Sequence, residues 1–240
     1  MLRGLALVAG ALLLAAPAAV RPFPHVAGCA RADFRSSGAT VRAELCGPAA
    51  GARAVIVLHG CGGFSTFDHR LAAELPAHRI STLYVDYFGP TPPPGNRGFC
   101  GGGGAGVDPF PTWERVAADA AASLRPRFAH VGAVGWSLGA GVAITSAEDR
   151  RPYDALAAFS SFAFGPVLGG ARRLPPSIFL DGGSHDIVPP ENARALFAAA
   201  KRAHVPAALY VYGNGTHNWP GAQGEAGIRR AAAFLLRYLR

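Results

Sequence analysis

The sequence GWSLG at residues 135–139 lies between an apolar run at 131–134 and a run of small residues at 140–147. This order is typical of a buried strand that turns abruptly into a helix. A serine on so tight a turn is held in a strained conformation with its hydroxyl projecting from the sheet. The residues two before and two after it must be small, because backbone crowds against them. The spacing therefore predicts a strand, a sharp turn at Ser137 and a helix.

Strands and helices alternate on both sides of this turn. Short apolar runs predict buried strands at 54–58, 82–87, 131–135, 155–159, 177–180 and 207–211. Helices are predicted at 68–77, 112–124 (with Thr112 as a possible cap), 138–147, 191–201 and 224–239, and a further strand at 40–45. We expect one α/β domain over residues 20–240, built on a doubly wound, mostly parallel sheet. The connection between 159 and 177 is too short for a large lid.

The first residues have the pattern of an export signal. Arg3 gives a positive start, an apolar run follows at 5–16, and small residues suited to cleavage lie at 17–19. The apolar run is too short for a permanent membrane anchor. We therefore expect residues 1–19 to be a cleaved signal peptide and the mature chain to be periplasmic or secreted, without stable insertion into the membrane.

Four cysteines fit an exported chain that contains disulfides. Their neighbourhoods in the sequence favour the pairs Cys29–Cys46 and Cys61–Cys100, among three possible connectivities. The sequence VAGC at 26–29 also resembles a lipobox, which leaves lipidation of Cys29 as a second interpretation, although residues 21–25 separate it from the apolar run. The chain contains no C-x-x-C pair, so we expect no zinc site.

The composition indicates a globular protein and argues against a nucleic-acid partner. Half of the 240 residues are hydrophobic and 16% are charged, which supplies enough apolar side chains for a core. The net charge of +8 comes from arginines that are scattered singly or in pairs, without a basic stripe or interleaved aromatic residues. Nothing in the sequence indicates the oligomeric state.

Polar residues follow three of the predicted strands at their carboxyl ends, where reactive groups gather in a parallel sheet. They are Ser137, Asp186 and His217, in that order along the chain. An imidazole can take the proton of a serine hydroxyl and return it to a leaving group, while a carboxylate holds the imidazole in the right tautomer. We therefore predict a Ser-His-Asp triad. Asp181, which directly ends a strand, is the alternative acid, but the pattern G-x-x-x-D-x-x-V-P favours Asp186.

Two backbone N–H groups are candidates for an oxyanion hole. The N–H of Leu138 lies at the start of the predicted helix, where the helix dipole favours negative charge. The N–H of Cys61 lies in the glycine-rich stretch after the strand at 54–58. We interpret His59 as a buried, hydrogen-bonded support for this stretch and the Cys61 thiol as a disulfide partner rather than a nucleophile.

Several aromatic residues flank the predicted triad. Trp136, Phe162, Phe164 and Trp219 are candidates for lining a substrate pocket, and core packing explains them equally well. A Ser-His-Asp triad needs no metal and no organic cofactor, so none is expected.

The chain resembles the dienelactone hydrolase family of α/β-hydrolases. The matching stretches are VLHGCGG at 57–63, YFGP at 87–90, GWSLG at 135–139, residues 182–189 and THNW at 216–219. The resemblance implies a compact, lidless hydrolase that acts on small esters or lactones. Dienelactone hydrolase itself uses a cysteine nucleophile where this chain has Ser137, and the family's acidic residue after the oxyanion-loop histidine is replaced by Gly60. The resemblance therefore implies serine ester hydrolysis rather than dienelactone itself as substrate.

The sequence thus predicts a serine esterase or lactonase that forms an acyl-enzyme on a small-molecule substrate. Two other interpretations use the same residues. The triad could pass the acyl group to an acceptor other than water, or cleave a peptide. A non-catalytic binding protein with this fold would require a broken triad, and Ser137, Asp186 and His217 are all present.

Overall fold

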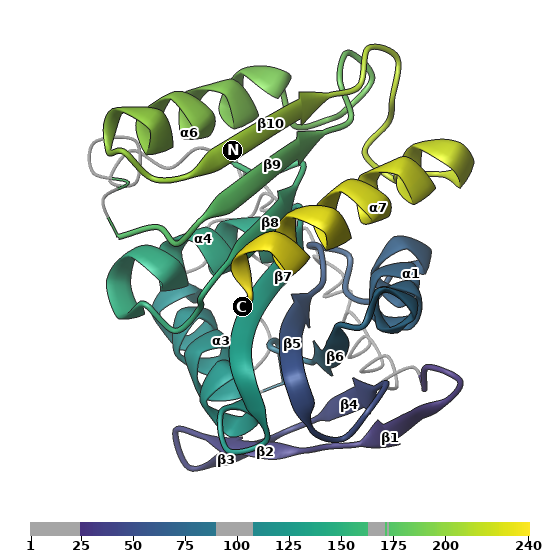
Figure 1. The fold of residues 1–240 in the computed structure, drawn as a ribbon, viewed down its shortest axis with the longest axis vertical. Helices are drawn as coiled ribbons and strands as arrows, with labels where there is room; N and C mark the ends of the chain where they lie inside the picture. Colours follow the sequence, from purple (N-terminus) through teal and green to yellow (C-terminus); the bar gives the residue numbers. More distant parts are fainter. Residues whose placement is uncertain (1–24, 90–107, 163–170, 172) are drawn as a thin grey trace, which may run out of the picture.

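The computed structural model describes residues 25–89, 108–162, 171 and 173–240 (Figure 1). The predicted signal peptide at 1–19, together with Cys100 and Phe164, lies outside these residues. An eight-stranded sheet has the order β1-β4-β6-β5-β7-β8-β9-β10, and its strands are Cys29–Arg31 (β1), Ala43–Cys46 (β4), Gly51–Leu58 (β5), Ser81–Val85 (β6), Phe128–Trp136 (β7), Leu156–Phe159 (β8), Ser177–Asp181 (β9) and Ala207–Val211 (β10). Strands β1 and β4 are antiparallel to their neighbours and the remaining pairs are parallel. The predicted doubly wound, mostly parallel sheet is confirmed.

The strand predicted at 40–45 is divided between two sheets, so this prediction was wrong in detail. Its first part, Ala39–Val41 (β3), forms a hairpin with Phe34–Ser36 (β2), while its second part becomes β4 of the main sheet. The change of partner falls at Arg42, whose backbone oxygen accepts from the Asp86 N–H (3.0 Å) and whose guanidinium donates to the Asp86 carboxylate (2.6 Å). Pairing with β6 therefore starts only after this residue.

The central strands alternate between two hydrophobic cores. In β5, Val55 and Val57 point to one core, and Ala54, Ile56 and Leu58 point to the other. This alternation follows from the two-residue period of a strand, and it explains why a strand covered on both faces is apolar throughout.

Helices cover both faces of the sheet (Figure 1). Residues of Thr66–Glu74 (α1) and Gly221–Tyr238 (α7) belong to the core that contains Val55, and residues of Phe110–Leu124 (α3), Leu138–Arg150 (α4) and Pro190–Arg202 (α6) belong to the other. A short 3-10 helix, Leu75–His78 (η1), continues α1. The helices predicted from the sequence are thus all present with shifted ends.

The starts of two helices differ from prediction, one because of a capping box and the other because of a proline in its first turn. Helix α1 begins at Thr66, since Ser65 and Asp68 form a capping box. Helix α3 begins at Phe110, and Thr112, predicted as a cap, lies in its first turn. A proline in the first turn of α3 has no N–H that would need a partner there, so the helix starts earlier than the polar residue suggested.

A disulfide joins Cys29 of β1 to Cys46 of β4, as predicted. Cys61 is also disulfide-bonded, and its predicted partner lies outside the described residues. The Cys29–Cys46 bond favours an oxidising, exported compartment. It also occupies the sulfur that lipidation of Cys29 would require.

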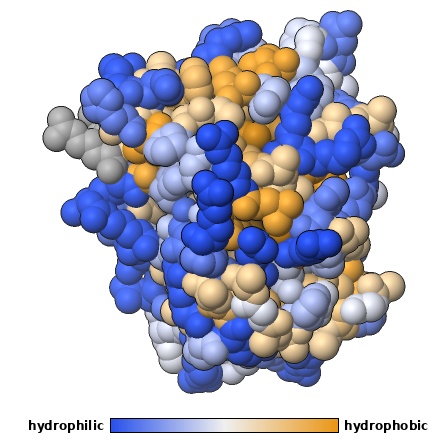
Figure 2. Space-filling view, in the orientation of Figure 1, coloured by the Kyte–Doolittle hydropathy of each residue, from blue (hydrophilic) through white to orange (hydrophobic). Residues whose placement is uncertain are grey.

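Hydrophilic and hydrophobic side chains are interspersed over the face of the molecule that carries α7 (Figure 2). Such mixing is usual for the surface of a globular protein. Within the described ranges, none of the helices combines the length and hydropathy that a membrane span needs.

Candidate functional site

Ser137 lies alone between the end of β7 and the start of α4. Its φ of 55° and ψ of −121° are unusual for a residue other than glycine. A Cβ atom at Gly135 would lie 2.4 Å from the carbonyl oxygen of Gly139, and one at Gly139 would lie 2.2 Å from that of Leu58. The predicted strand-turn-helix is therefore present, and its two glycines are required by close backbone contacts.

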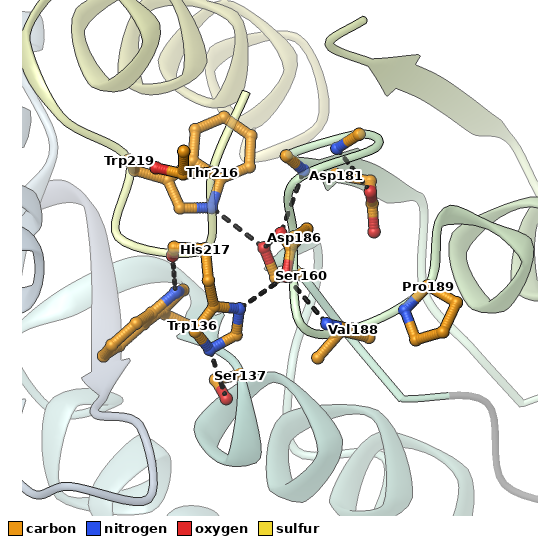
Figure 3. A network of polar contacts seen from close by, with 12 residues as sticks. Trp136, Ser137, Ser160, Asp181, Asp186, Val188, Pro189, Thr216, His217 and Trp219 are labelled. Carbon is orange, nitrogen blue, oxygen red and sulfur yellow. Dashed lines mark hydrogen bonds and ion pairs between the residues drawn. The ribbon is translucent and has the colours of Figure 1, made fainter. Parts of the chain in front are cut away.

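The loops after β9 and β10 bring Asp186 and His217 to this turn (Figure 3). His217 Nε2 lies 3.0 Å from Ser137 Oγ, and His217 Nδ1 lies 2.6 Å from Asp186 Oδ1. The Ser137 residue is only 5% exposed, and the Asp186 side chain is fully buried. The structure thus joins the three predicted residues in one continuous chain of hydrogen bonds.

The Asp186 carboxylate accepts four hydrogen bonds. Besides the His217 bond, Oδ1 accepts from the Val188 N–H (2.9 Å), and Oδ2 accepts from the Gly182 N–H (3.1 Å) and from the Ser160 hydroxyl. Burial alone would raise the pKa of Asp186, but the bonds from His217, Ser160 and Val188 hold it below its ordinary value. The carboxylate therefore stays ionised beside the imidazole.

Asp181, the alternative acid, makes no such bond to His217. It lies at the end of β9 with no exposed surface, and its Oδ1 accepts from the Gly183 N–H at 2.8 Å. Burial raises its pKa to about 6. Asp181 therefore stabilises the turn that follows β9, and Asp186 is the acid that faces His217.

Two tryptophans hold the His217 segment in place. The indole N–H of Trp136 donates to the backbone oxygen of His217 (2.8 Å), and the two rings lie 5.0 Å apart. The indole N–H of Trp219 donates to the Ser160 hydroxyl (2.9 Å). Both indoles are buried, at 7% and 1% exposure.

The aromatic residues predicted as pocket candidates lie in different environments. Trp219 packs against Phe67 and Phe159 and lies on the side of Asp186 away from Ser137, which favours core packing, one of the two interpretations left open by the sequence. Trp136 contacts His217 directly, and Phe162, at 38% exposure, follows β8 at the same sheet edge.

The glycine-rich stretch after β5 is supported by a buried histidine, as predicted. His59 has no exposed surface and stacks on Tyr87, with ring centroids 4.3 Å apart. Its Nδ1 lies 2.9 Å from the Gly60 oxygen, and the Tyr87 hydroxyl donates to the His59 oxygen at 2.8 Å. Burial lowers the pKa of His59 to about 4, so the ring is neutral at pH 7 and Nδ1–H can donate to Gly60.

The two candidates for the oxyanion hole come from the glycine-rich stretch after β5 and from the start of α4. Cys61 follows Gly60 and is half-buried, and Leu138 begins α4 directly after Ser137. A Cβ atom on Gly60 would lie 2.6 Å from the Trp136 ring, so only glycine allows this loop to approach the turn so closely. The described residues contain no cluster of His, Cys, Asp or Glu side chains suited to a metal ion.

Ser160 is a site residue that sequence reasoning missed. It directly follows β8 and is fully buried. The signal was the one used for the triad, a polar residue at the carboxyl end of a parallel strand. It was overlooked because no motif surrounds it.

No protein-family profile and no curated protein sequence matches the chain. Solved structures do match. A Klebsiella pneumoniae protein assigned as a dienelactone hydrolase is 17% identical with a TM-score of 0.74, over 88% of this chain and 98% of that one. A dienelactone hydrolase from Anabaena variabilis is 16% identical (TM-score 0.71, 90% and 100% covered), and a thermostable esterase from Pseudomonas putida is 15% identical (0.71, 91% and 86%). The expected likeness to dienelactone hydrolases is therefore confirmed in the architecture, and the chain has the α/β-hydrolase fold.

Proposed function

We propose that this protein is a serine hydrolase that cleaves small carboxylic esters or lactones through an acyl-enzyme on Ser137. The observation that carries the proposal is the unbroken contact from Ser137 through His217 to Asp186, with distances of 3.0 and 2.6 Å. These are hydrogen-bond distances between a nucleophile, a base and an acid in the order that acyl transfer uses.

The reaction follows from the roles that these groups can take. His217 Nε2 removes the proton as Ser137 Oγ attacks the carbonyl carbon, and it then protonates the leaving alkoxide. Asp186, held ionised by its four donors, stabilises the imidazolium that forms in between. Water, deprotonated by the same imidazole, then attacks the acyl-enzyme and releases the acid.

The oxyanion of each tetrahedral intermediate requires donors that are already in place. We assign this role to the backbone N–H groups of Leu138 and Cys61. Leu138 opens α4, so its N–H has no partner within the helix. The loop that carries Cys61 is held beside the turn by the contacts of His59 and by the Gly60–Trp136 approach.

Small, partly apolar substrates suit this site best. Two partly exposed apolar residues are close in sequence to the hydrogen-bond network: Phe162 (38% exposed) lies two positions after Ser160, and Ile187 (79% exposed) directly follows Asp186. The esterases and dienelactone hydrolases with the same fold support hydrolysis of esters or lactones as the chemistry. The Cys29–Cys46 disulfide supports an exported protein.

Covalent labelling with a fluorophosphonate tests the proposal before any substrate is known. We expect one adduct on the intact protein by mass spectrometry, none on Ser137→Ala, and an unchanged adduct on Ser184→Ala. Ser184 is a matched control because it lies exposed on the loop before Asp186 without contacting an imidazole.

Hydrolysis of p-nitrophenyl acetate and of a simple lactone then separates esterase from lactonase activity. Hydroxylamine as an added acceptor distinguishes transfer to water from transfer to another nucleophile. If the folded wild-type protein forms no adduct, the serine-hydrolase proposal is wrong and a binding function replaces it.

A further inference from the structure

Ser160 lies next to Asp186 and has a strained backbone conformation. It is the first residue after β8, it has no exposed surface, and its φ is 47°. Its backbone N–H donates to the Leu180 oxygen at 2.7 Å, which extends the pairing of β8 with β9 by one residue. A non-glycine residue with such a φ is uncommon, and surrounding structure must hold it there.

The hydroxyl of Ser160 has two partners, and their chemistry fixes its proton. An indole N–H can only donate, so Trp219 Nε1 must donate to Ser160 Oγ across the 2.9 Å contact. A hydroxyl has a single proton, and that proton must then point to the second partner, Asp186 Oδ2. The direction of the hydrogen bond to the carboxylate is therefore set by the tryptophan.

Trp219 is itself immobilised by the core. Its ring stacks on Phe67 with centroids 5.7 Å apart and meets Phe159 edge to face at 5.0 Å. A Cβ atom on Gly227 of α7 would lie 2.8 Å from the same ring. The orientation of the Ser160 hydroxyl thus rests on packing between α1, α7 and the sheet.

We propose that Ser160 is a positioning residue of the catalytic site, whose hydroxyl, oriented by Trp219, holds Asp186 with Oδ1 toward His217. The inference rests on the proposed function. Two of the other donors to Asp186 are backbone N–H groups, of Gly182 and Val188, so Ser160 is the side chain through which the carboxylate can be tested without touching the triad.

Two variants remove the hydroxyl in different ways. Ser160→Ala keeps the Cβ atom and leaves the Trp219 N–H and Asp186 Oδ2 without their partner. Ser160→Gly also loses the hydroxyl, but glycine accepts a φ of 47° readily, so the backbone conformation is kept without strain. Ser161→Ala is the matched control, because Ser161 is the adjacent serine, equally buried, and its hydroxyl has no hydrogen-bond partner among the described residues.

We expect kcat for p-nitrophenyl acetate to fall about tenfold in both Ser160 variants with little change in KM, because a carboxylate that is no longer held with Oδ1 toward His217 aligns the imidazole less well with Ser137. A tenfold loss corresponds to the free energy of about one hydrogen bond to a charged group. Without the hydroxyl proton the carboxylate charge is less compensated and binds the protonated imidazole more tightly. The acidic limb of the pH profile of kcat/KM should therefore move to higher pH. Ser161→Ala should match the wild-type protein in both respects.

A double-mutant cycle tests whether Trp219 acts through Ser160. Trp219→Phe keeps an aromatic ring in the core but removes the donor, so kcat should fall by a smaller factor. Combined with Ser160→Ala it should add little, since the hydroxyl that it orients is already gone. Independent, additive losses would contradict the relay.

A readout without turnover separates this inference from the proposed function. The His217 Nδ1–H proton, assigned by its loss in His217→Ala, should shift in the NMR spectra of both Ser160 variants but not in that of Ser161→Ala. Failure of the wild-type protein to react with a fluorophosphonate would overturn the proposed function. A reactive wild type with unchanged kcat, pH profile and Nδ1–H resonance in the Ser160 variants would overturn only the inference about Ser160.

Discussion

The loop after β9 carries two aspartates whose surroundings give them opposite properties. Asp186 receives four donors and its pKa lies below the ordinary value, whereas burial raises the pKa of Asp181 to about 6. The two residues are only five positions apart, yet Asp186 contacts the His217 imidazole while Asp181 accepts from the Gly183 N–H in the turn after β9. At the scale of single residues, hydrogen-bond donors rather than residue type decide which acid takes part in the proposed reaction.

Exchange of each aspartate for asparagine separates these two roles. Asp186→Asn keeps the shape but presents an amide that favours the wrong imidazole tautomer, so kcat/KM should fall by about 10³–10⁴. Asp181→Asn keeps the oxygen that accepts from Gly183 and should change kcat/KM by less than about threefold. Ester hydrolysis rates of the two purified variants provide the measurement. Equal losses of kcat/KM in the two variants would contradict the role of Asp186 as the acid of the proposed triad.

At the scale of a single element, the start of helix α1 depends on a buried carboxyl group. Its capping box uses Asp68, whose Oδ2 accepts from the Ser65 N–H (3.0 Å) and hydroxyl (2.8 Å). Asp68 has no exposed surface, and burial raises its pKa to about 7 from an ordinary value of 3.8. The start of α1 is therefore held by a carboxyl group that stays largely protonated in the folded protein below neutral pH.

This shift makes stability depend on pH in a defined direction. Between about pH 4 and about pH 7 the folded protein keeps a proton on Asp68 that the unfolded chain releases. The contribution of Asp68 to the free energy of unfolding should therefore decrease as pH rises through this window, by at most about 1.4 kcal/mol per pH unit. Asp68→Asn cannot titrate, so its stability relative to the wild-type protein should increase over the same range.

Urea denaturation at a series of pH values measures this difference. Ser65→Ala serves as the control, since it removes the cap at a cost of about 1 kcal/mol while Asp68 still titrates. Parallel pH dependences in the wild-type protein and in Asp68→Asn would rule out Asp68 as the source of the slope.

At the scale of the whole molecule, the sheet places the Cys29–Cys46 disulfide and the three residues of the proposed triad in different regions. The Cys29–Cys46 bond joins β1 and β4 at one edge, whereas Ser137, Asp186 and His217 follow β7, β9 and β10. Stability and activity should therefore respond separately to loss of the bond.

The double variant Cys29→Ser/Cys46→Ser tests this separation. The bond closes a loop with a sequence separation of 17, and its loss should lower the free energy of unfolding by about 3 kcal/mol. Ester hydrolysis well below the unfolding temperature should stay near the wild-type rate. Paired variants are preferable to a reductant, because Cys61 is also disulfide-bonded. A large loss of activity in the folded variant would contradict the separation.

The sheet and the three residues of the proposed triad could be predicted from the sequence because their signals are local. Apolar runs identify buried strands, and each triad residue lies just after one of them within a recognisable pattern. The role of Ser160 and the choice between core and pocket for Trp219 were not predictable in this way. Both depend on contacts between segments far apart in the chain: Ser160 and Trp219 are separated by 59 positions. The division of 40–45 between two sheets likewise depends on Asp86, 44 positions from Arg42.

The order of these elements along the chain has a consequence for biosynthesis. Ser137 precedes His217 by 80 positions. The His217 backbone oxygen accepts from Trp136, which precedes the turn at Ser137, and the neighbouring Thr216 is hydrogen-bonded to Gln223 of α7. A growing polypeptide therefore acquires its proposed nucleophile long before its proposed acid and base. Under the proposed function, a chain that crosses a membrane unfolded would remain inert toward esters until β10 and α7 pack. Latency of the proposed activity during synthesis thus follows from the order of these residues along the chain.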